Sequence, residues 1–166
     1  AVTEIMYHPP ASVEYPLLNA DLFEFFELHN TGTETIDLSG MQFTRGISYT
    51  FPEGFLLPAG GYTVLVADLD MFSSRYPFCT PGGVYDGRLD NDFDRVTFVD
   101  ADGETVFSFT YCDAAYWPRE PDGGGFSLVP ADEPESEDLN DPANWTASRL
   151  YLGSPGAGEN DTTDTP

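Results

Sequence analysis

The sequence predicts an all-β protein, a β-sandwich of short antiparallel strands with long loops. Three observations carry this prediction. Short segments that alternate apolar and polar residues, or that are rich in β-branched residues, recur along the chain. Glycine and proline, 16 and 14 among 166 residues, fall largely between these segments. No segment carries the helical period for more than two turns, and roughly eight strands are expected.

The first strands are expected close to the N-terminus. Residues 2–7, VTEIMY, alternate and end at two prolines, which stop strand pairing. A polar loop then leads to residues 22–30, LFEFFELHN. One face of this strand carries Leu22, Glu24, Phe26 and Leu28, and the other Phe23, Phe25, Glu27 and His29. Because both faces are partly apolar, this strand is expected near the centre of a sheet.

The middle of the chain continues the same pattern. Residues 36–46, IDLSGMQFTRG, predict two short strands with a Ser-Gly break, and a further strand is expected at 49–51. Residues 62–67, YTVLVA, have the clearest β-branched content. One helical turn is expected directly afterwards, with Asp68 or Asp70 as its N-cap.

A hairpin is the clearest local signal. Residues 95–99 and 105–111 alternate and flank DADGE, whose Asp-Gly supplies the left-handed turn position. A late strand is expected at GGGFSLV, residues 123–129, followed by an acidic loop with proline that ends at Asp141. Residues 140–160 have the composition of a loop, although they contain Trp145.

Several segments in this order resemble a known family. They are TEIMYHPP, FEFFELHNTGTETIDLSGMQF, LPAGGYTVLVAD, GRLDNDFDRVTFVDADGETVFSFTY, WPREPDGGGFSLV and NDPANWTAS with LGSPGAGEN. Together they resemble the lamin tail domain, in its bacterial, secreted version. The resemblance covers nearly the whole chain from Val2 to Asn160 and depends on the order and spacing of these motifs.

The resemblance implies an immunoglobulin-like sandwich at residues 1–157, with residues 158–166 as a Thr/Pro/Asp-rich linker or tail. It also implies that Trp117 and Trp145 are structural aromatic plugs, with a ligand platform as the alternative. Nuclear lamins use the domain for protein and chromatin interactions. Bacterial secreted or surface proteins carry it as an appended module. The family therefore implies a fold and an interaction module rather than a reaction.

Charge excludes some partners. The chain has 29 acidic and six basic residues, all of them arginine, and a formal charge of −23. Nucleic acid and anionic membranes would repel such a surface, since both are bound through Lys and Arg. No apolar run reaches the ~20 residues of a membrane span. Salt adaptation and calcium binding both account for the acidity.

Calcium prefers carboxylate, amide and carbonyl oxygens, and three clusters offer these ligands. The candidate residues are Asp86, Asp90, Asn91, Asp92 and Asp94; Asp68 and Asp70; and Asp100, Asp102 and Glu104. None has EF-hand spacing, and plain solvated turns are the alternative in each case. The acidic loop from Asp132 to Asp141 is a further candidate with the same alternative.

The two cysteines, Cys79 and Cys112, are not in a CxxC pair, and with only two histidines a zinc site is not expected. A single Cys79–Cys112 disulfide is expected, which implies an oxidising compartment; two buried free thiols are the alternative. His8 and His29 are interpreted as turn residues. No nucleophile elbow or phosphate loop is present, so no enzyme is expected.

The sequence therefore favours a non-catalytic structural or interaction module of a secreted or surface protein, located outside the cell. Its partners would be neighbouring domains or copies of itself. The first alternative is a self-assembling subunit of an extracellular filament or surface layer, with strand exchange and calcium at its contacts. The weaker alternative is polysaccharide binding through exposed aromatic residues, for which the candidates are Tyr15, Tyr85, Tyr116 and Tyr151.

Overall fold

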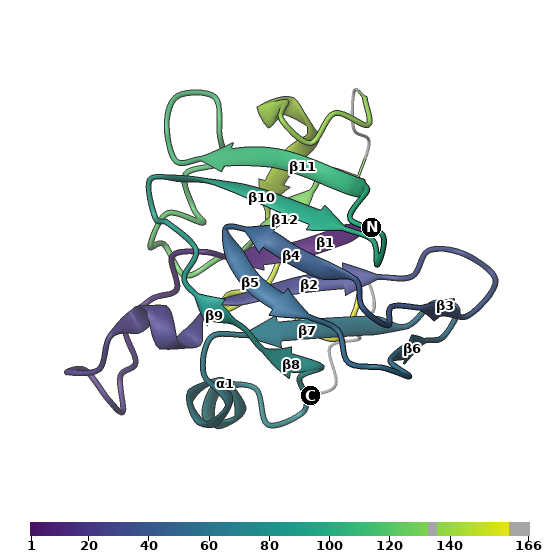
Figure 1. Ribbon diagram of the computed structural model, residues 1–166. Coiled ribbons are helices and arrows are strands. Elements are labelled where there is room, and N and C mark those ends of the chain that lie inside the picture. Colours follow the sequence, from purple (N-terminus) through teal and green to yellow (C-terminus); the bar gives the residue numbers. More distant parts are fainter. Residues whose placement is uncertain (133–135, 160–166) are drawn as a thin grey trace.

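The computed structural model describes residues 1–132 and 136–159, and it shows two facing sheets and a short two-stranded ladder (Figure 1). The six-stranded sheet holds, in spatial order, β13 (Trp145–Ala147), β12 (Leu128–Pro130), β1 (Val2–Met6), β2 (Phe25–His29), β7 (Tyr62–Val66) and β8 (Gly83–Val84). The five-stranded sheet holds β11 (Thr105–Cys112), β10 (Phe93–Val99), β4 (Gln42–Arg45), β5 (Ile47–Thr50) and β9 (Asp86–Gly87). The ladder pairs β3 (Ile36–Asp37) with β6 (Leu56–Leu57). The predicted all-β sandwich is confirmed.

The predicted hairpin is the longest antiparallel pair. β10 and β11 pair from Phe93↔Cys112 to Val99↔Thr105. The Asp100 N–H donates to the Glu104 carbonyl at 2.8 Å and closes the turn. Gly103 has φ +88°, a conformation that glycine adopts without steric cost.

Several elements differ from the sequence expectation of roughly eight strands: the described residues form 13, and β6, β8 and β9 were not expected as strands. Residues 145–147, expected in a loop, form the edge strand β13, which pairs with β12. β8 runs parallel to β7, whereas every pair was expected to be antiparallel. The strand expected from Leu22 starts only at Phe25, because Ala20–Phe23 is a 3₁₀ helix whose N-cap, Asn19, accepts the Asp21 N–H at 3.2 Å. A second 3₁₀ helix covers Pro142–Asn144.

The main core lies between the sheets and is rich in aromatic rings. Phe43 lies at its centre, with ring centroids 5.0 Å from Phe26 and 4.6 Å from Phe98. Trp145 is 4% exposed, and its ring centroid lies 5.5 Å from that of Phe109. Burial of such side chains stabilises the fold by about 1.5–3 kcal/mol each.

The outer face of the six-stranded sheet is also covered. The helix α1 (Leu69–Arg75) is capped by Asp68, whose side chain accepts the Met71 N–H at 2.9 Å. Phe72 and Tyr76 pack edge-on against Phe25 on this face. The expectation that residues 22–30 form a strand near the centre of a sheet is therefore confirmed for β2, which lies between β1 and β7. The helices among the described residues are α1 and two 3₁₀ helices. None of them is long and apolar enough to span a bilayer.

Candidate functional site

An apolar groove opens between the two sheets, at the end of the sandwich where the chain begins. Its volume is about 340 Å³. Ala1 and Leu28 line one side of it, and Val106 and Phe107 of β11 line the other. Leu38 and Met41 lie between these two sides, next to the β3–β6 ladder. The groove therefore leads from the surface to the aromatic main core.

β11 forms the edge of the five-stranded sheet beside this groove. The Thr110 N–H points away from β10, since it donates to the Asn140 side chain at 3.0 Å. Peptide groups alternate in direction along an antiparallel strand, so Ser108 also presents its N–H and C=O to the outside. Asn140 covers the end of this edge at Thr110, and Val106 near its start is 52% exposed. Among the described residues no other strand pairs with this side of β11, and this open part of the edge ends at the groove.

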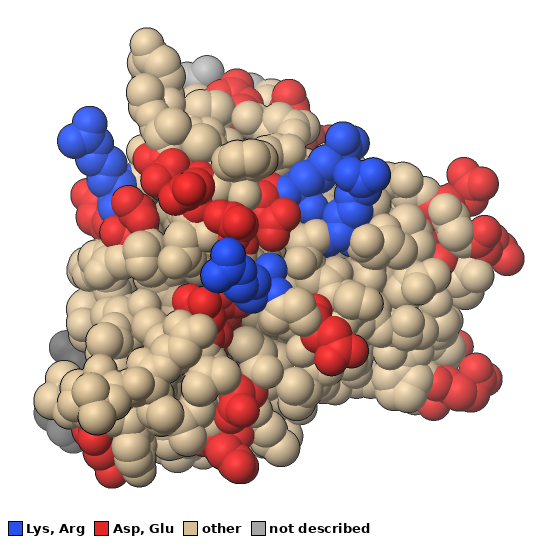
Figure 2. Space-filling model, turned by 60° about the vertical axis from the view of Figure 1, so that its left-hand side comes forward, with Lys and Arg blue, Asp and Glu red and all other residues tan. Residues whose placement is uncertain are grey.

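An acidic turn lies beside this region, and the chain as a whole has 29 carboxylate side chains. The turn between β10 and β11 carries Asp100, Asp102 and Glu104 directly before Val106. Figure 2 shows acidic side chains spread over one face of the molecule, with the few arginines among them. Basic partners are therefore attracted to the surface as a whole.

Two of the three calcium clusters lie mainly in separate turns, around Asp90–Asp94 and Asp100–Glu104. The Asp90 side chain accepts the Asp92 N–H at 3.1 Å, and Asp94 accepts the Asp90 N–H at 3.3 Å. Asp100 accepts the N–H groups of Asp102 and Glu104 at 3.0 and 2.9 Å. These oxygens hold local turns.

The remaining calcium candidates lie in other elements or next to these turns. Asp68 caps α1, Asp70 lies in the first turn of that helix, Asp86 begins β9, and Asn91 lies between Asp90 and Asp92. Within residues 1–132 and 136–159, no three His, Cys, Asp or Glu side chains are placed to hold a metal ion. The acidic loop lies partly outside the described residues. Calcium binding stays a prediction.

The expected disulfide is absent. Cys79 and Cys112, both within the described residues, are free thiols. Cys79 follows α1 on the outer face of the six-stranded sheet, whereas Cys112 ends β11 in the other sheet. Their separation in different layers was not visible in their spacing along the chain.

The aromatic candidates fall into two groups. Trp145 donates its indole N–H to the Leu139 carbonyl at 2.9 Å, and Trp117 packs on it at 6.3 Å between ring centroids. Tyr85 is only 3% exposed, which excludes it as a surface platform for sugar. Tyr15, Tyr116 and Tyr151 are 40%, 92% and 60% exposed.

The two histidines have structural partners. His8 Nδ1 lies 2.7 Å from Asp122 Oδ1. The His29 ring stacks on Tyr62 with centroids 4.0 Å apart. Both contacts bring together residues that are distant in the sequence or on neighbouring strands, so the histidines are more than local turn residues.

Two buried glutamates on the outer face of the six-stranded sheet were missed by the sequence reasoning. Glu4 and Glu27 are directly opposite each other on β1 and β2, and each is 1% exposed. Glu4 accepts the Ser154 N–H at 3.0 Å and the Ser127 hydroxyl. Glu27 accepts the Gly156 N–H at 2.6 Å and the Thr3 hydroxyl at 2.6 Å.

These two carboxyl groups hold residues 150–159 against the sheet. Burial, and for Glu4 also the charge of Glu27, raises the pKa of Glu4 to about 8, and burial raises the pKa of Glu27 to about 7. Glu159 accepts the Arg149 N–H at 2.6 Å, so the ordered contacts extend past the expected domain end at residue 157. The rest of the predicted tail, residues 160–166, lies outside the described residues.

Comparison with protein families gives the class of the chain. The lamin tail domain family matches residues 1–113, which include β1 to β11. The chain belongs to the lamin tail domain family. Lamin tail domains are immunoglobulin-like, non-catalytic modules that take part in protein interactions. A comparison with curated proteins gives no match.

Proposed function

We propose that this chain is an extracellular interaction module that binds an extended segment of a partner protein along β11. The observation that carries the proposal is the open strand edge that ends at an apolar groove. Strand addition gains affinity from main-chain hydrogen bonds and specificity from pockets that take alternate side chains. Here Ser108 offers the hydrogen-bonding edge, and the groove beside Val106 offers the pocket.

The partner segment is expected to carry a large apolar residue with basic neighbours. The groove reaches Phe107 and Leu28, so its lining matches an aliphatic or aromatic side chain. The acidic turn before Val106 and the net charge of −23 favour Lys and Arg next to it. A location outside the cell is part of the proposal and is supported by the resemblance to bacterial secreted lamin tail domains.

A displayed library of random linear peptides, selected on the whole chain, tests the proposal. Selected peptides should combine an apolar residue with flanking basic residues, and their NMR footprint should cover Leu28, Val106 and Ser108. Val106→Asp places a charge at the groove and should abolish binding. The matched control is Val84→Asp, because Val84 is 47% exposed on the edge strand of the other sheet. A footprint elsewhere, or equal loss in both variants, would contradict the proposal.

Self-assembly is the second candidate, because the same open edge accepts a strand from another copy. Light scattering coupled to size exclusion, at fixed ionic strength with EDTA, magnesium or calcium, distinguishes the two. Assembly that is lost in Val106→Asp would replace the partner segment with a second copy. A thermal melt in the same buffers tests calcium, since a ligand of the folded state raises the melting temperature. A shift with calcium but not with magnesium would support a calcium site.

A further inference from the structure

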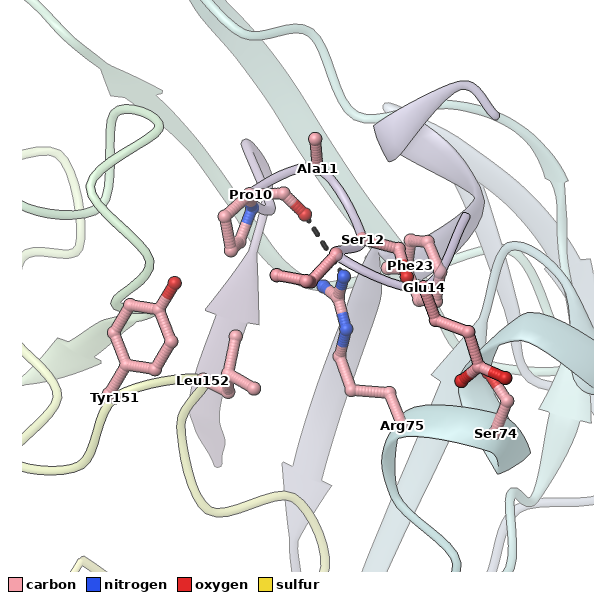
Figure 3. A pocket seen from close by; sticks show the side chains of 10 residues that line it. Pro10, Ala11, Ser12, Glu14, Phe23, Ser74, Arg75, Tyr151 and Leu152 are labelled. Atoms are coloured by element: carbon pink, nitrogen blue, oxygen red, sulfur yellow. Dashed lines mark hydrogen bonds between the residues drawn. The ribbon is translucent and has the colours of Figure 1, made fainter. Parts of the chain in front are cut away.

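A second pocket, with different chemistry, lies on the side of the molecule that carries α1. Its volume is about 240 Å³. Three segments that are distant in the sequence form it: the loop at residues 10–14, the end of α1 with Phe23 beside it, and the turn at residues 151–152 (Figure 3). The interaction proposed above does not use this pocket.

Arg75 brings a positive charge into this pocket. Its guanidinium carbon lies 3.6 Å from the centroid of the Phe23 ring, and Nη2 donates to the Pro10 carbonyl at 3.0 Å. Nη1 is buried and has no hydrogen-bond partner among the described residues. Burial lowers the pKa of Arg75, but an arginine stays protonated in proteins. The pocket therefore contains a half-buried cation, one of whose N–H groups is buried without a hydrogen-bond partner among the described residues.

No carboxylate of the described residues forms an ion pair with Arg75, although the chain has 29 acidic residues. Glu14 lines the pocket, and Figure 3 shows its carboxylate turned toward Ser74 rather than toward the guanidinium. An unpaired buried donor is costly to the folded protein, and a charged one more so. A ligand carboxylate at this position would remove that cost.

Part of the pocket wall is apolar, formed by Phe23, Tyr151 and Leu152, and the backbone of Leu152 is strained. Leu152 has φ +71°, a left-handed conformation that is unfavourable for leucine. It is held there by the Tyr76 hydroxyl, which donates to its carbonyl at 2.8 Å, and by its own N–H, which donates to Gly125 O at 2.6 Å. Strained residues fixed by their surroundings gather at ligand sites. At the rim, Val13 is 98% exposed and Tyr151 60%.

We propose that this pocket binds a single carboxylate carried on an apolar body, as at the carboxyl end of a peptide or of a fatty acid. The guanidinium would pair with the carboxylate through its fork of N–H donors. Phe23, Tyr151 and Leu152 would contact the apolar body. The volume is below that of pockets for drug-sized molecules and suits a group the size of one residue. Polyanions are disfavoured by Glu14 and by the charge of the whole chain.

NMR titration of the whole chain tests this with a matched pair of probes, N-acetylphenylalanine and N-acetylphenylalaninamide. The two differ in the charge that Arg75 would bind. The acid should bind at least about tenfold more tightly than the amide. The loop at residues 10–14 lines the pocket, so its amide resonances should move together with those of Leu152 and Arg75 Nε–H.

Arg75→Gln should abolish the preference for the acid, and Arg45→Gln, an exposed arginine on β4, should leave it unchanged. Tyr151→Ala keeps Arg75 in place and should weaken both probes, which covers the case that Arg75→Gln does not fold. Octanoate as a third probe distinguishes a fatty acid from the carboxyl end of a peptide. If octanoate binds more tightly than N-acetylphenylalanine, the ligand is a fatty acid; if it binds more weakly, the ligand is a peptide end. Equal affinity for acid and amide, or equal effects of Arg75→Gln and Arg45→Gln, would overturn the proposal.

Discussion

The two faces of the β1–β2 pair bury their side chains by different means. Toward the main core the strands present Ile5, Phe26 and Leu28, which pack against rings of the other sheet. Toward the outside they present Glu4 and Glu27, equally buried but held by hydrogen bonds to residues that follow β12 and β13. Burial of the first face is stabilised by the apolar area removed from water and by side-chain packing. The second depends on whether every buried oxygen has a donor.

The largest effect is expected in the main core. Phe43→Ala should destabilise the fold by about 3–5 kcal/mol, because it removes a buried ring and leaves a cavity among neighbouring rings. Chemical denaturation measures this change. Phe78→Ala, at a residue that is 73% exposed, is the control and should change stability by less than about 0.5 kcal/mol. Similar losses in both variants would show that the core is not the main source of stability.

The next largest effect is expected on the outer face. Gly153 has φ +76°, and a Cβ there would collide with Glu4 Oε1. Gly153→Ala should therefore destabilise the fold by about 1–3 kcal/mol through overpacking and strain. Gly60→Ala is the matched control, since Gly60 has φ +70° but no atom within 4 Å of an added Cβ. If both variants lost the same amount of stability, the collision with Glu4 would not contribute to the loss.

The outer face should also make stability depend on pH. On this face burial raises the pKa of Glu4 to about 8 and that of Glu27 to about 7; on the core side, burial also raises the pKa of Glu24, which accepts the Tyr85 hydroxyl, to about 8, all from 4.5. As pH rises above about 4.5, the unfolded chain loses these protons first, so the folded state becomes less stable up to about pH 8. The melting temperature should thus fall by several degrees between pH 5 and pH 8.

The double variant Glu4→Gln, Glu27→Gln should flatten this pH dependence, because glutamine keeps the shape without the proton. Glu24 continues to contribute, so the slope should decrease and not vanish. Glu53→Gln, at an exposed loop residue, is the control and should leave the slope unchanged. Stability that rises with pH in the unmodified chain would contradict the burial of these groups as acids.

The smallest effect concerns one hydrogen bond on the outer face. Tyr76→Phe removes the hydroxyl that donates to the Leu152 carbonyl but keeps the ring packed on Phe25. Stability should decrease by about 0.5–1.5 kcal/mol in a denaturant titration. Tyr116→Phe, at a residue that is 92% exposed, should have no measurable effect. A neutral Tyr76→Phe would mean that ring packing alone holds the turn at Leu152.

The sequence predicted the strand segments and the main hairpin well. Residues 95–99 and 105–111 carry an alternation and a turn signal within one short window, which is why their pairing was readable. The sequence did not predict β13, because its three residues, which include Trp145, are too few to show an alternation of apolar and polar side chains. Calcium binding by the acidic turns stays a prediction; in the structure, Asp90 and Asp100 of these turns accept hydrogen bonds from their own backbone.

The sequence by itself thus determined the fold class, most of the longer strands of the sandwich and the strong negative charge, because alternation, turn residues and charge are local properties of a chain. Only the tertiary structure decided that Glu4 and Glu27 are buried, that Cys79 and Cys112 lie in different layers, and that Arg75 lies beside Phe23 without a carboxylate partner among the described residues. Each of these outcomes depends on which distant segment covers a given face. Segments 150–159 and 10–14 show no alternation of apolar and polar residues from which their positions could be predicted. Their positions depend on the buried carboxylates and cavities that the assembled sheets present.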